Sequence, residues 1–275
     1  MIHSTRMVDT IEQPEDAAMP THEGRESLLN PTYSIVIPAY NEARRITATL
    51  EKVLAYVAEQ QWAAEIIVVN DGSRDQTAEI VHRFMEQNAA VRLLENPGNR
   101  GKGYSVRNGV LNARGKWILF SDADLSSPIA EAPKLFAALA AGADVAMGSR
   151  WLQRQTQTLR QPLFRQILGR VFNGLLQMIL GLKYEDTQCG FKAFTRDAAQ
   201  VLFSRQKIDR WAFDPELLFI ADRLGVKVEE VPVAWAHDKL TTISPLRDGP
   251  RMFGELLQVR WNALLGRYKI DASHR

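Results

Sequence analysis

The sequence predicts an α/β fold built on a doubly wound, mostly parallel sheet. Short apolar runs alternate with longer amphipathic segments through the first half of the chain. Three of these runs, at 35–39, 66–69 and 117–120, are followed at once by polar and acidic residues. Alternation of this kind is typical of parallel strands joined by right-handed helical crossovers. Because ligands bind such sheets outside the carboxyl ends of the strands, the same pattern predicts where a binding site lies.

Apolar periodicity places the individual elements. We expect buried strands at 34–40, 65–69, 91–94, 117–121 and 144–148. We expect helices at 42–60, 75–88, 103–113 and 129–141. In the first of these helices one face carries Ile46, Leu50, Val53, Leu54 and Val57. A face of this kind predicts packing against the sheet.

The two ends of the chain depart from this pattern. Residues 1–31 mix acidic residues, prolines and threonines without apolar periodicity, so we expect a disordered tail. They contain no apolar run long enough for a signal peptide or a membrane span. We expect the main domain to cover 32–243, and a C-terminal amphipathic helix with a basic tail to cover 244–275.

Charge is unevenly distributed although the formal net charge is only +2, which gives no indication of nucleic-acid binding. No acidic residue lies between Asp144 and Glu185, whereas this stretch contains Arg150, Arg154, Arg160, Arg165, Arg170 and Lys183. Such a stretch suits an anionic ligand or an anionic membrane surface, and a merely solvated basic face is the alternative. The single cysteine, Cys189, excludes an intrachain disulfide and favours a reducing compartment.

Two later segments carry apolar pairs spaced four residues apart, at 163–182 and at 251–268. Each predicts a helix with a wide apolar stripe and with arginines nearby. Neither contains the roughly 18 uninterrupted apolar residues of a spanning helix. One interpretation is that both are core helices, and the other is that both lie in a bilayer interface with their arginines at headgroup level. Because two such segments accompany a basic stretch, we expect amphipathic membrane-interface helices at both.

Acidic residues at the predicted strand ends are the candidate site. Asp122 and Asp124 follow the run 117–121, and two carboxylates one residue apart can share a divalent cation. Asp71 lies on a strand-to-helix turn, where a carboxylate can accept hydrogen bonds from a base or a ribose. Asp75 is available to cap the helix that follows.

Two further motifs resemble known signatures without matching them. The segment 96–103 is rich in glycine, but Gly103 stands where a phosphate loop needs Ser or Thr to hold magnesium. A glycine-rich turn that opens a helix beneath a nucleotide fits this segment better. The segment 206–211 has one residue too many for the Gln-x-x-Arg-Trp signature of processive polysaccharide synthases. Those enzymes also need membrane spans, so we reject that interpretation.

Several blocks together resemble the family 2 glycosyltransferases of GT-A fold, and most of all the dolichyl-phosphate β-glucosyltransferases. The blocks typical of the whole superfamily are Val36–Glu42, Asn70–Ser73, Asn99–Gly103, Asp122–Asp124 and Gly148–Arg150. Two later blocks resemble the glucosyl branch rather than its mannosyl relatives: Asp186–Lys192 and Arg210–Asp214 with Glu216–Leu218. The similarity extends over about residues 33–270.

This resemblance implies inverting transfer of glucose from UDP-glucose to a polyisoprenyl phosphate of the dolichyl type. It also implies peripheral attachment to the cytoplasmic face of a membrane, because the N-terminal anchor of the eukaryotic members has no counterpart in this sequence. Another nucleotide-sugar transferase, using GDP-mannose or UDP-N-acetylglucosamine, is the alternative. A non-catalytic membrane scaffold would not need both Asp122 and Asp124. The oligomeric state cannot be read from the sequence.

The resemblance also implies roles for individual residues. Asp71 would contact the uracil, Asp122 the ribose or the metal, and Asp124 would hold Mg²⁺ or Mn²⁺ on the diphosphate. Arg150 and Arg165 would bind phosphate. The expected substrate-binding residues are Pro38, Tyr40, Glu42, Asp71, Lys102, Asp122, Arg150, Arg165, Gln188 and Lys239. The expected catalytic residues are Asp122, Asp124, Asp214 and Arg150.

Four positions qualify these roles. Asp238 replaces the serine that precedes the family's lysine at Lys239, and Ser126 stands where mannosyl relatives supply a glutamine to the metal. Asp214 and Glu216 are candidate bases, although a structural hydrogen bond or a helix cap is the rival role for Asp214. A phosphate monoester is largely dianionic at pH 7, so it needs positioning more than deprotonation.

Overall fold

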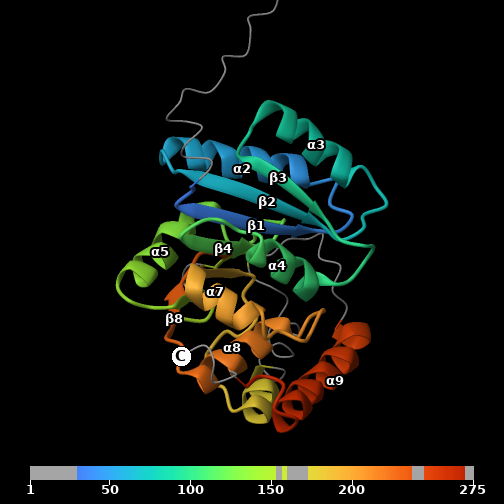
Figure 1. The fold of residues 1–275 in the computed structure, drawn as a ribbon, viewed down its shortest axis with the longest axis vertical. Helices are drawn as coiled ribbons and strands as arrows, with labels where there is room; N and C mark the ends of the chain where they lie inside the picture. The colour runs from blue at the N-terminus through green and yellow to red at the C-terminus, as the bar shows by residue number, and fades with distance from the viewer. Residues whose placement is uncertain (1–29, 153–156, 160–172, 237–244, 270–275) are drawn as a thin grey trace, which may run out of the picture.

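The computed structural model describes residues 30–152, 157–159, 173–236 and 245–269 (Figure 1). Its centre is a seven-stranded sheet with the order β3-β2-β1-β4-β7-β5-β8. The strands are β1 (Tyr33–Ala39), β2 (Ala64–Asn70), β3 (Val91–Glu95), β4 (Trp117–Ser121), β5 (Val145–Ser149), β7 (Phe191–Thr195) and β8 (Val228–Pro232). A second, two-stranded sheet pairs β6 (Gln157–Leu159) with β9 (Trp235–Ala236).

The predicted mostly parallel α/β sheet is confirmed. Strands β1, β2, β3 and β4 pair in parallel, and so do β5 and β8. Strand β7 is antiparallel to both of its neighbours, β4 and β5, so it separates two parallel halves. All five strands expected from the sequence form within one residue of their predicted ends. Strands β7 and β8 were not predicted.

Helices cover both faces of the sheet. The helices are α2 (Ile46–Glu59), α3 (Thr77–Gln87), α4 (Lys102–Leu111), α5 (Ala132–Ala140), α7 (Arg196–Phe203), α8 (Phe213–Leu224) and α9 (Pro245–Leu264). A 3-10 turn at Ile129–Glu131 precedes α5, and residues 173–180 are also helical. The four helices predicted before residue 142 are confirmed, but the first begins at Ile46 rather than at 42.

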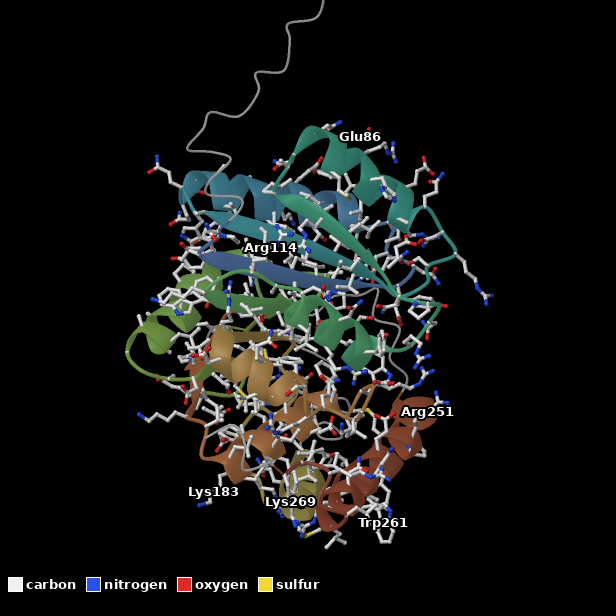
Figure 2. All side chains as sticks on the ribbon, in the orientation of Figure 1. Glu86, Arg114, Lys183, Arg251, Trp261 and Lys269 are labelled. Carbon is white, nitrogen blue, oxygen red and sulfur yellow. The ribbon has the colours of Figure 1, made fainter. Side chains whose placement is uncertain are left out.

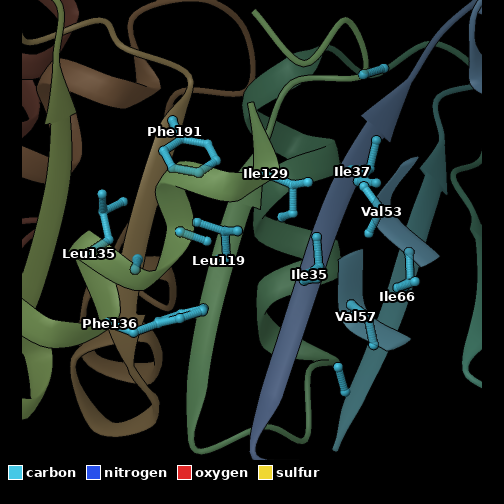
Figure 3. Close-up of a cluster of buried hydrophobic side chains, with 14 of the residues drawn as sticks. Ile35, Ile37, Val53, Val57, Ile66, Leu119, Ile129, Leu135, Phe136 and Phe191 are labelled. Carbon is cyan, nitrogen blue, oxygen red and sulfur yellow. The ribbon is translucent and has the colours of Figure 1, made fainter. Parts of the chain in front are cut away.

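Successive side chains of a strand point to opposite faces of the sheet, so alternate strand residues contribute to two separate hydrophobic cores. Ile35 and Ile37 of β1 pack with α2, α3 and α5 in one cluster (Figure 3). Val36, between them, belongs to the opposite cluster with α4, α7 and α8. Helix α4 approaches β1 very closely, because a Cβ at Gly109 would lie 2.3 Å from a methyl group of Val36.

The two apolar stripes have different environments. In the described part of the first segment, Leu176 and Leu180 are buried in the second core, so the stripe there is a core stripe, and the expectation of an interface helix is wrong for these residues. Residues 163–172 lie outside the described residues. Among the side chains of α9 that the structure describes, the buried apolar ones are Leu256 and Val259, which join the second core, while several others are exposed. Over the described ranges, no helix is both long enough and apolar enough to cross a membrane.

Candidate active site

The carboxylate of Asp122 stands at the carboxyl end of β4, where it is fixed by the neighbouring β7. The Asp122 amide donates to the carbonyl of Gly190 at 3.1 Å, just before β7 begins. A Cβ at position 190 would lie only 2.0 Å from Oδ2 of Asp122. Only glycine therefore leaves room for the carboxylate. The block Asp186–Lys192 therefore positions the block Asp122–Asp124, and no sequence pattern had indicated this contact.

Among the residues that the structure describes, Lys102, the first residue of α4, forms the ion pair with this carboxylate. Its Nζ lies 2.6 Å from Oδ1 of Asp122, and over the rings of Phe120 and Trp211 at 5.3 and 5.7 Å. Burial lowers the pKa of Lys102, but the surrounding carboxylates, above all Asp122 and Asp214, outweigh it and raise the pKa overall. The ammonium group is therefore fully charged at neutral pH.

Asp124 lies beside Asp122 in a strained turn. Its Oδ1 accepts a hydrogen bond of 2.8 Å from the amide of Ser126, and Leu125 between them has a φ of 47°, in the left-handed region. Burial, followed by the negative charge of Asp122, raises the pKa of Asp124. The two carboxylates repel each other, so a cation held between them would be bound favourably.

Asp71, at the end of β2, holds the glycine-rich turn in place. One carboxylate oxygen accepts from the amide of Arg100 at 2.9 Å and from Nδ2 of Asn96 at 2.8 Å. The other accepts from the amide of Gly101 at 2.8 Å. Gly101 has a φ of 111°, a conformation that residues other than glycine rarely adopt. Asp71 thus sets the position of Lys102, and its expected contact with uracil stays a prediction.

Arg150, at the end of β5, forms a two-pronged ion pair with Asp186. Its Nε and one terminal nitrogen each lie 2.7 Å from a carboxylate oxygen, and its amide donates to the same group at 3.0 Å. Burial raises the pKa of Asp186, but Arg150 more than offsets this and the pKa falls. The guanidinium also lies 5.6 Å from the Trp235 ring. Asp186 gives Arg150 a fixed orientation, and the expected phosphate contact stays a prediction.

Asp214, in the first turn of α8, pairs with a buried lysine. Nζ of Lys192 lies 2.7 Å from Oδ1 of Asp214 and donates to the carbonyl of Cys189 at 2.6 Å. Both side chains are buried. This contact gives Asp214 the structural role considered above, as an ion-pair partner rather than as a cap, since the N-cap of α8 is Ala212. Its catalytic role stays a prediction.

Glu216, the other candidate base, is surrounded by hydrogen-bond donors. Its carboxylate accepts from the amides of Lys207 and Ile208, each at 2.9 Å, and from the hydroxyl of Tyr268 at 2.7 Å. The side chain is fully buried. Burial raises the pKa of Glu216 to about 7 although these hydrogen bonds oppose the rise. Glu216 therefore ties α8 to the segment before it and to the chain after α9.

The remaining expected residues lie at the same sheet edge or outside the described ranges. Pro38 and Tyr40 are at the end of β1, and Glu42 follows them, paired with Arg45 at 2.6 Å. Gln188 is half-buried, and its amide approaches Asp186 at 3.4 Å. Arg165, Lys239 and Asp238 lie outside the described residues.

The residues at this edge suit a divalent cation that is shared with a substrate. Within the described ranges, His, Cys, Asp and Glu do not gather in groups of three or more that could hold a metal ion by themselves. Mg²⁺ is typically held by one or two carboxylates together with substrate phosphates rather than by an all-protein cage. Asp122 and Asp124 match that donor set.

Comparison with known proteins identifies relatives over most of the chain. The profile of glycosyl transferase family 2 matches residues 34–203. A dolichyl-phosphate beta-glucosyltransferase of Drosophila melanogaster is 36% identical over 86% of this chain and 77% of its own length. A Trichomonas vaginalis protein of the same name, ALG5C, is 43% identical over 74% of this chain. The alignment spans 63% of that relative's length.

Solved structures show the same fold. Glucosyl-3-phosphoglycerate synthase from Mycobacterium tuberculosis, solved with UDP, superposes with a TM-score of 0.60 at 21% identity. The match covers 96% of this chain and 88% of that one. The same enzyme solved with Mn²⁺, UDP-glucose and phosphoglyceric acid gives a TM-score of 0.59 at 21% identity. These likenesses confirm the GT-A type of sheet.

Proposed function

Because the chain belongs to glycosyl transferase family 2, we propose that it transfers glucose from UDP-glucose to a polyisoprenyl phosphate of the dolichyl type, with inversion. The observation that carries this proposal is the pair Asp122 and Asp124, fixed at the end of β4 by Gly190 of the late block. Relatives named dolichyl-phosphate beta-glucosyltransferase support the sugar and the acceptor. The neighbour solved with Mn²⁺ and UDP-glucose supports the donor and the metal.

The donor side of the site stabilises the departing UDP. Asp122 and Asp124 would hold Mg²⁺ or Mn²⁺, which when bound supplies charge stabilisation for the diphosphate. Lys102 lies close enough to Asp122 to contact the same diphosphate. Removing a group that stabilises developing charge typically costs about 3–4 kcal/mol of barrier.

The acceptor side needs orientation rather than a base. A phosphate monoester is largely dianionic at pH 7 and already nucleophilic. The described residues agree with this, because Asp214 is paired with Lys192 and Glu216 is enclosed by Lys207, Ile208 and Tyr268. Arg150, with one edge of its guanidinium held by Asp186, would offset the repulsion between two anionic substrates.

The acceptor is a lipid, so we infer that α9 docks on the cytoplasmic face of a membrane. Five apolar residues of α9 and the turn after it are exposed: Phe253, Leu257, Trp261, Leu264 and Leu265. Leu264 is 80% exposed and Trp261 is 60% exposed, and Figure 2 shows Trp261 pointing away from the body of the molecule. Exposed basic residues accompany them, namely Arg251, Arg260, Arg267 and Lys269. A helix with this distribution suits the headgroup region of a bilayer.

Incubation of the purified protein with radiolabelled UDP-glucose and a polyprenyl phosphate, followed by organic extraction, tests the function. Label should enter the organic phase only when metal and lipid phosphate are both present. GDP-mannose and UDP-N-acetylglucosamine are the comparison donors. Calorimetry should show UDP binding with metal and much weaker GDP binding. Faster transfer from either comparison donor would overturn the choice of UDP-glucose, and absence of transfer from all three would overturn the acceptor.

A further inference from the structure

Lys102 pairs with the carboxylate of Asp122, the same group that is proposed to bind the metal ion. Its Nζ is 2.6 Å from Oδ1 of Asp122, the distance of a direct ion pair. Two cations on the same carboxylate repel each other strongly in a partly buried site. A divalent ion on Asp122 and Lys102 in its present position are therefore poorly compatible.

The backbone that carries Lys102 leaves little room to relieve this conflict. A Cβ at Gly101 would lie 2.5 Å from the carbonyl oxygen of Asp209, and one at Gly103 would lie 2.7 Å from Cβ of Phe213. Asp71 also fixes the turn through the amide of Gly101. The side chain of Lys102, with four rotatable carbons, is the part that can move.

We propose that Lys102 neutralises Asp122 in the donor-free enzyme. When a divalent cation binds Asp122, the ammonium group of Lys102 moves to the diphosphate of UDP. This inference rests on the proposed function. The diphosphate brings the negative charge that receives the displaced ammonium group. A metal ion that binds alone must displace Lys102 and leaves its ammonium group without a new partner. When UDP binds as well, its diphosphate provides that partner. Metal and UDP therefore bind cooperatively, and by linkage each raises the affinity for the other equally.

Titration of the full chain with Mn²⁺ alone, followed by electron paramagnetic resonance of free Mn²⁺, tests the proposal. The same titration is repeated with UDP present, and UDP binding is measured with and without Mn²⁺. The variant is Lys102→Met, which keeps much of the side chain's length and removes its charge. The control is Lys116→Met, because Lys116 also lies over an aromatic ring, 5.0 Å from the centroid of Trp117, but at the opposite end of β4.

In the wild type, UDP should raise the affinity for Mn²⁺ on the order of 10-fold or more, within the usual range of coupling between sites. Lys102→Met should bind Mn²⁺ alone on the order of 10-fold more tightly than the wild type. Its coupling between Mn²⁺ and UDP should be smaller than in the wild type, and the part that remains comes from direct contact of the metal with the diphosphate. Lys116→Met should behave as the wild type. Lys102→Arg, which keeps the charge, should still bind Mn²⁺ alone weakly.

Two results would overturn the proposal. One is unchanged or weaker binding of Mn²⁺ alone to a folded Lys102→Met, with folding checked by circular dichroism. The other, which needs no variant, is independent binding of Mn²⁺ and UDP to the wild type. Both are distinguishable from failure of the proposed function, in which the wild type would bind neither UDP nor Mn²⁺ with UDP present.

Discussion

The hydroxyl of Tyr268 donates a hydrogen bond of 2.7 Å to Glu216, which joins the chain just after α9 to the first turn of α8. A second contact ties the same two helices, because Glu255 of α9 accepts from the amide of Ala212 at 2.9 Å. Helix α9 is therefore anchored by polar groups on its inner side, although much of its apolar surface faces outward.

Stability should fall as the pH rises through the titration range of Glu216. Burial raises its pKa from 4.5 to about 7, so between these values the folded protein binds more protons than the unfolded chain. The free energy of unfolding then decreases with rising pH. The contribution of this group is fully present below pH 4.5 and is lost as the pH passes 7, which corresponds to about 3 kcal/mol.

Chemical denaturation of the wild type and of Glu216→Gln at several pH values measures this effect. The difference between the two unfolding free energies should change in favour of the variant by about 3 kcal/mol from pH 4 to pH 8. Glu229→Gln, an exposed carboxylate on β8, is the control and should show little change. A difference independent of pH would mean that Glu216 keeps an ordinary pKa.

Gly190→Ala should abolish metal-dependent UDP binding with less effect on folding. The added Cβ would lie 2.0 Å from Oδ2 of Asp122, so the carboxylate must move. Calorimetry with Mn²⁺ and UDP measures the loss. Gly174→Ala is the matched control, because it lies in a helix with nothing within 4 Å of the added carbon, and it should stabilise the protein by about 0.5–1 kcal/mol. If Gly190→Ala bound UDP as tightly as the wild type does, the present position of the Asp122 carboxylate would not be needed for UDP binding.

Asp124→Ala should lose most turnover while remaining folded. The variant removes one of the two carboxylates proposed to hold the metal, and such losses cost about 3–4 kcal/mol of barrier, or on the order of 100- to 1,000-fold in rate. The lipid-transfer assay measures it, with Asp197→Ala on the exposed side of α7 as the control. Undiminished activity of Asp124→Ala in EDTA would exclude a metal at this position.

Replacement of Leu257, Trp261 and Leu264 by Ser should weaken flotation with liposomes. These side chains are exposed, so the variant should fold. Transfer to a long-chain acceptor should fall further than hydrolysis of UDP-glucose, because only the former requires the bilayer. High salt should weaken the binding of the wild type, since each basic residue near an anionic surface contributes about 1 kcal/mol.

Gln258→Ser, at an exposed polar position on the same helix, is the control for this triple variant. A wild-type protein that never floats with liposomes would make the lipid acceptor doubtful. Equal flotation of the triple variant and the wild type would assign membrane contact to another surface.

Local patterns predicted the first half of the fold because its strands are apolar runs and its helices are amphipathic. Asp122 and Asp124 were identified for the same reason, since the end of a strand can be read from the sequence. Strand β7 was missed because Lys192 and Thr195 interrupt its apolar character. The buried partner of Lys192 is Asp214, 22 residues away, and no local pattern reports such a pairing.

The partners of the site residues were the least predictable part. The two-pronged contact of Asp186 with Arg150 depends on where β5 ends relative to the loop before β7. The apolar stripe at 163–182 could not be assigned from periodicity alone, because a core helix and an interface helix share the same pattern. Leu176 belongs to the core, whereas Leu264 is exposed.

The central place of β7 has a consequence for how the protein folds. Strands β4 and β5 do not pair with each other, and each bonds instead to β7, which follows β5 by more than 40 residues. Until β7 inserts, both strands keep unpaired edges, which are prone to aggregation. Gly190 lies directly before β7 and Lys192 lies within it, so the backbone contact that holds Asp122 forms when β7 joins the sheet. A chain truncated before β7 would lack both residues, so the first half alone forms neither the complete sheet nor the contact that fixes Asp122.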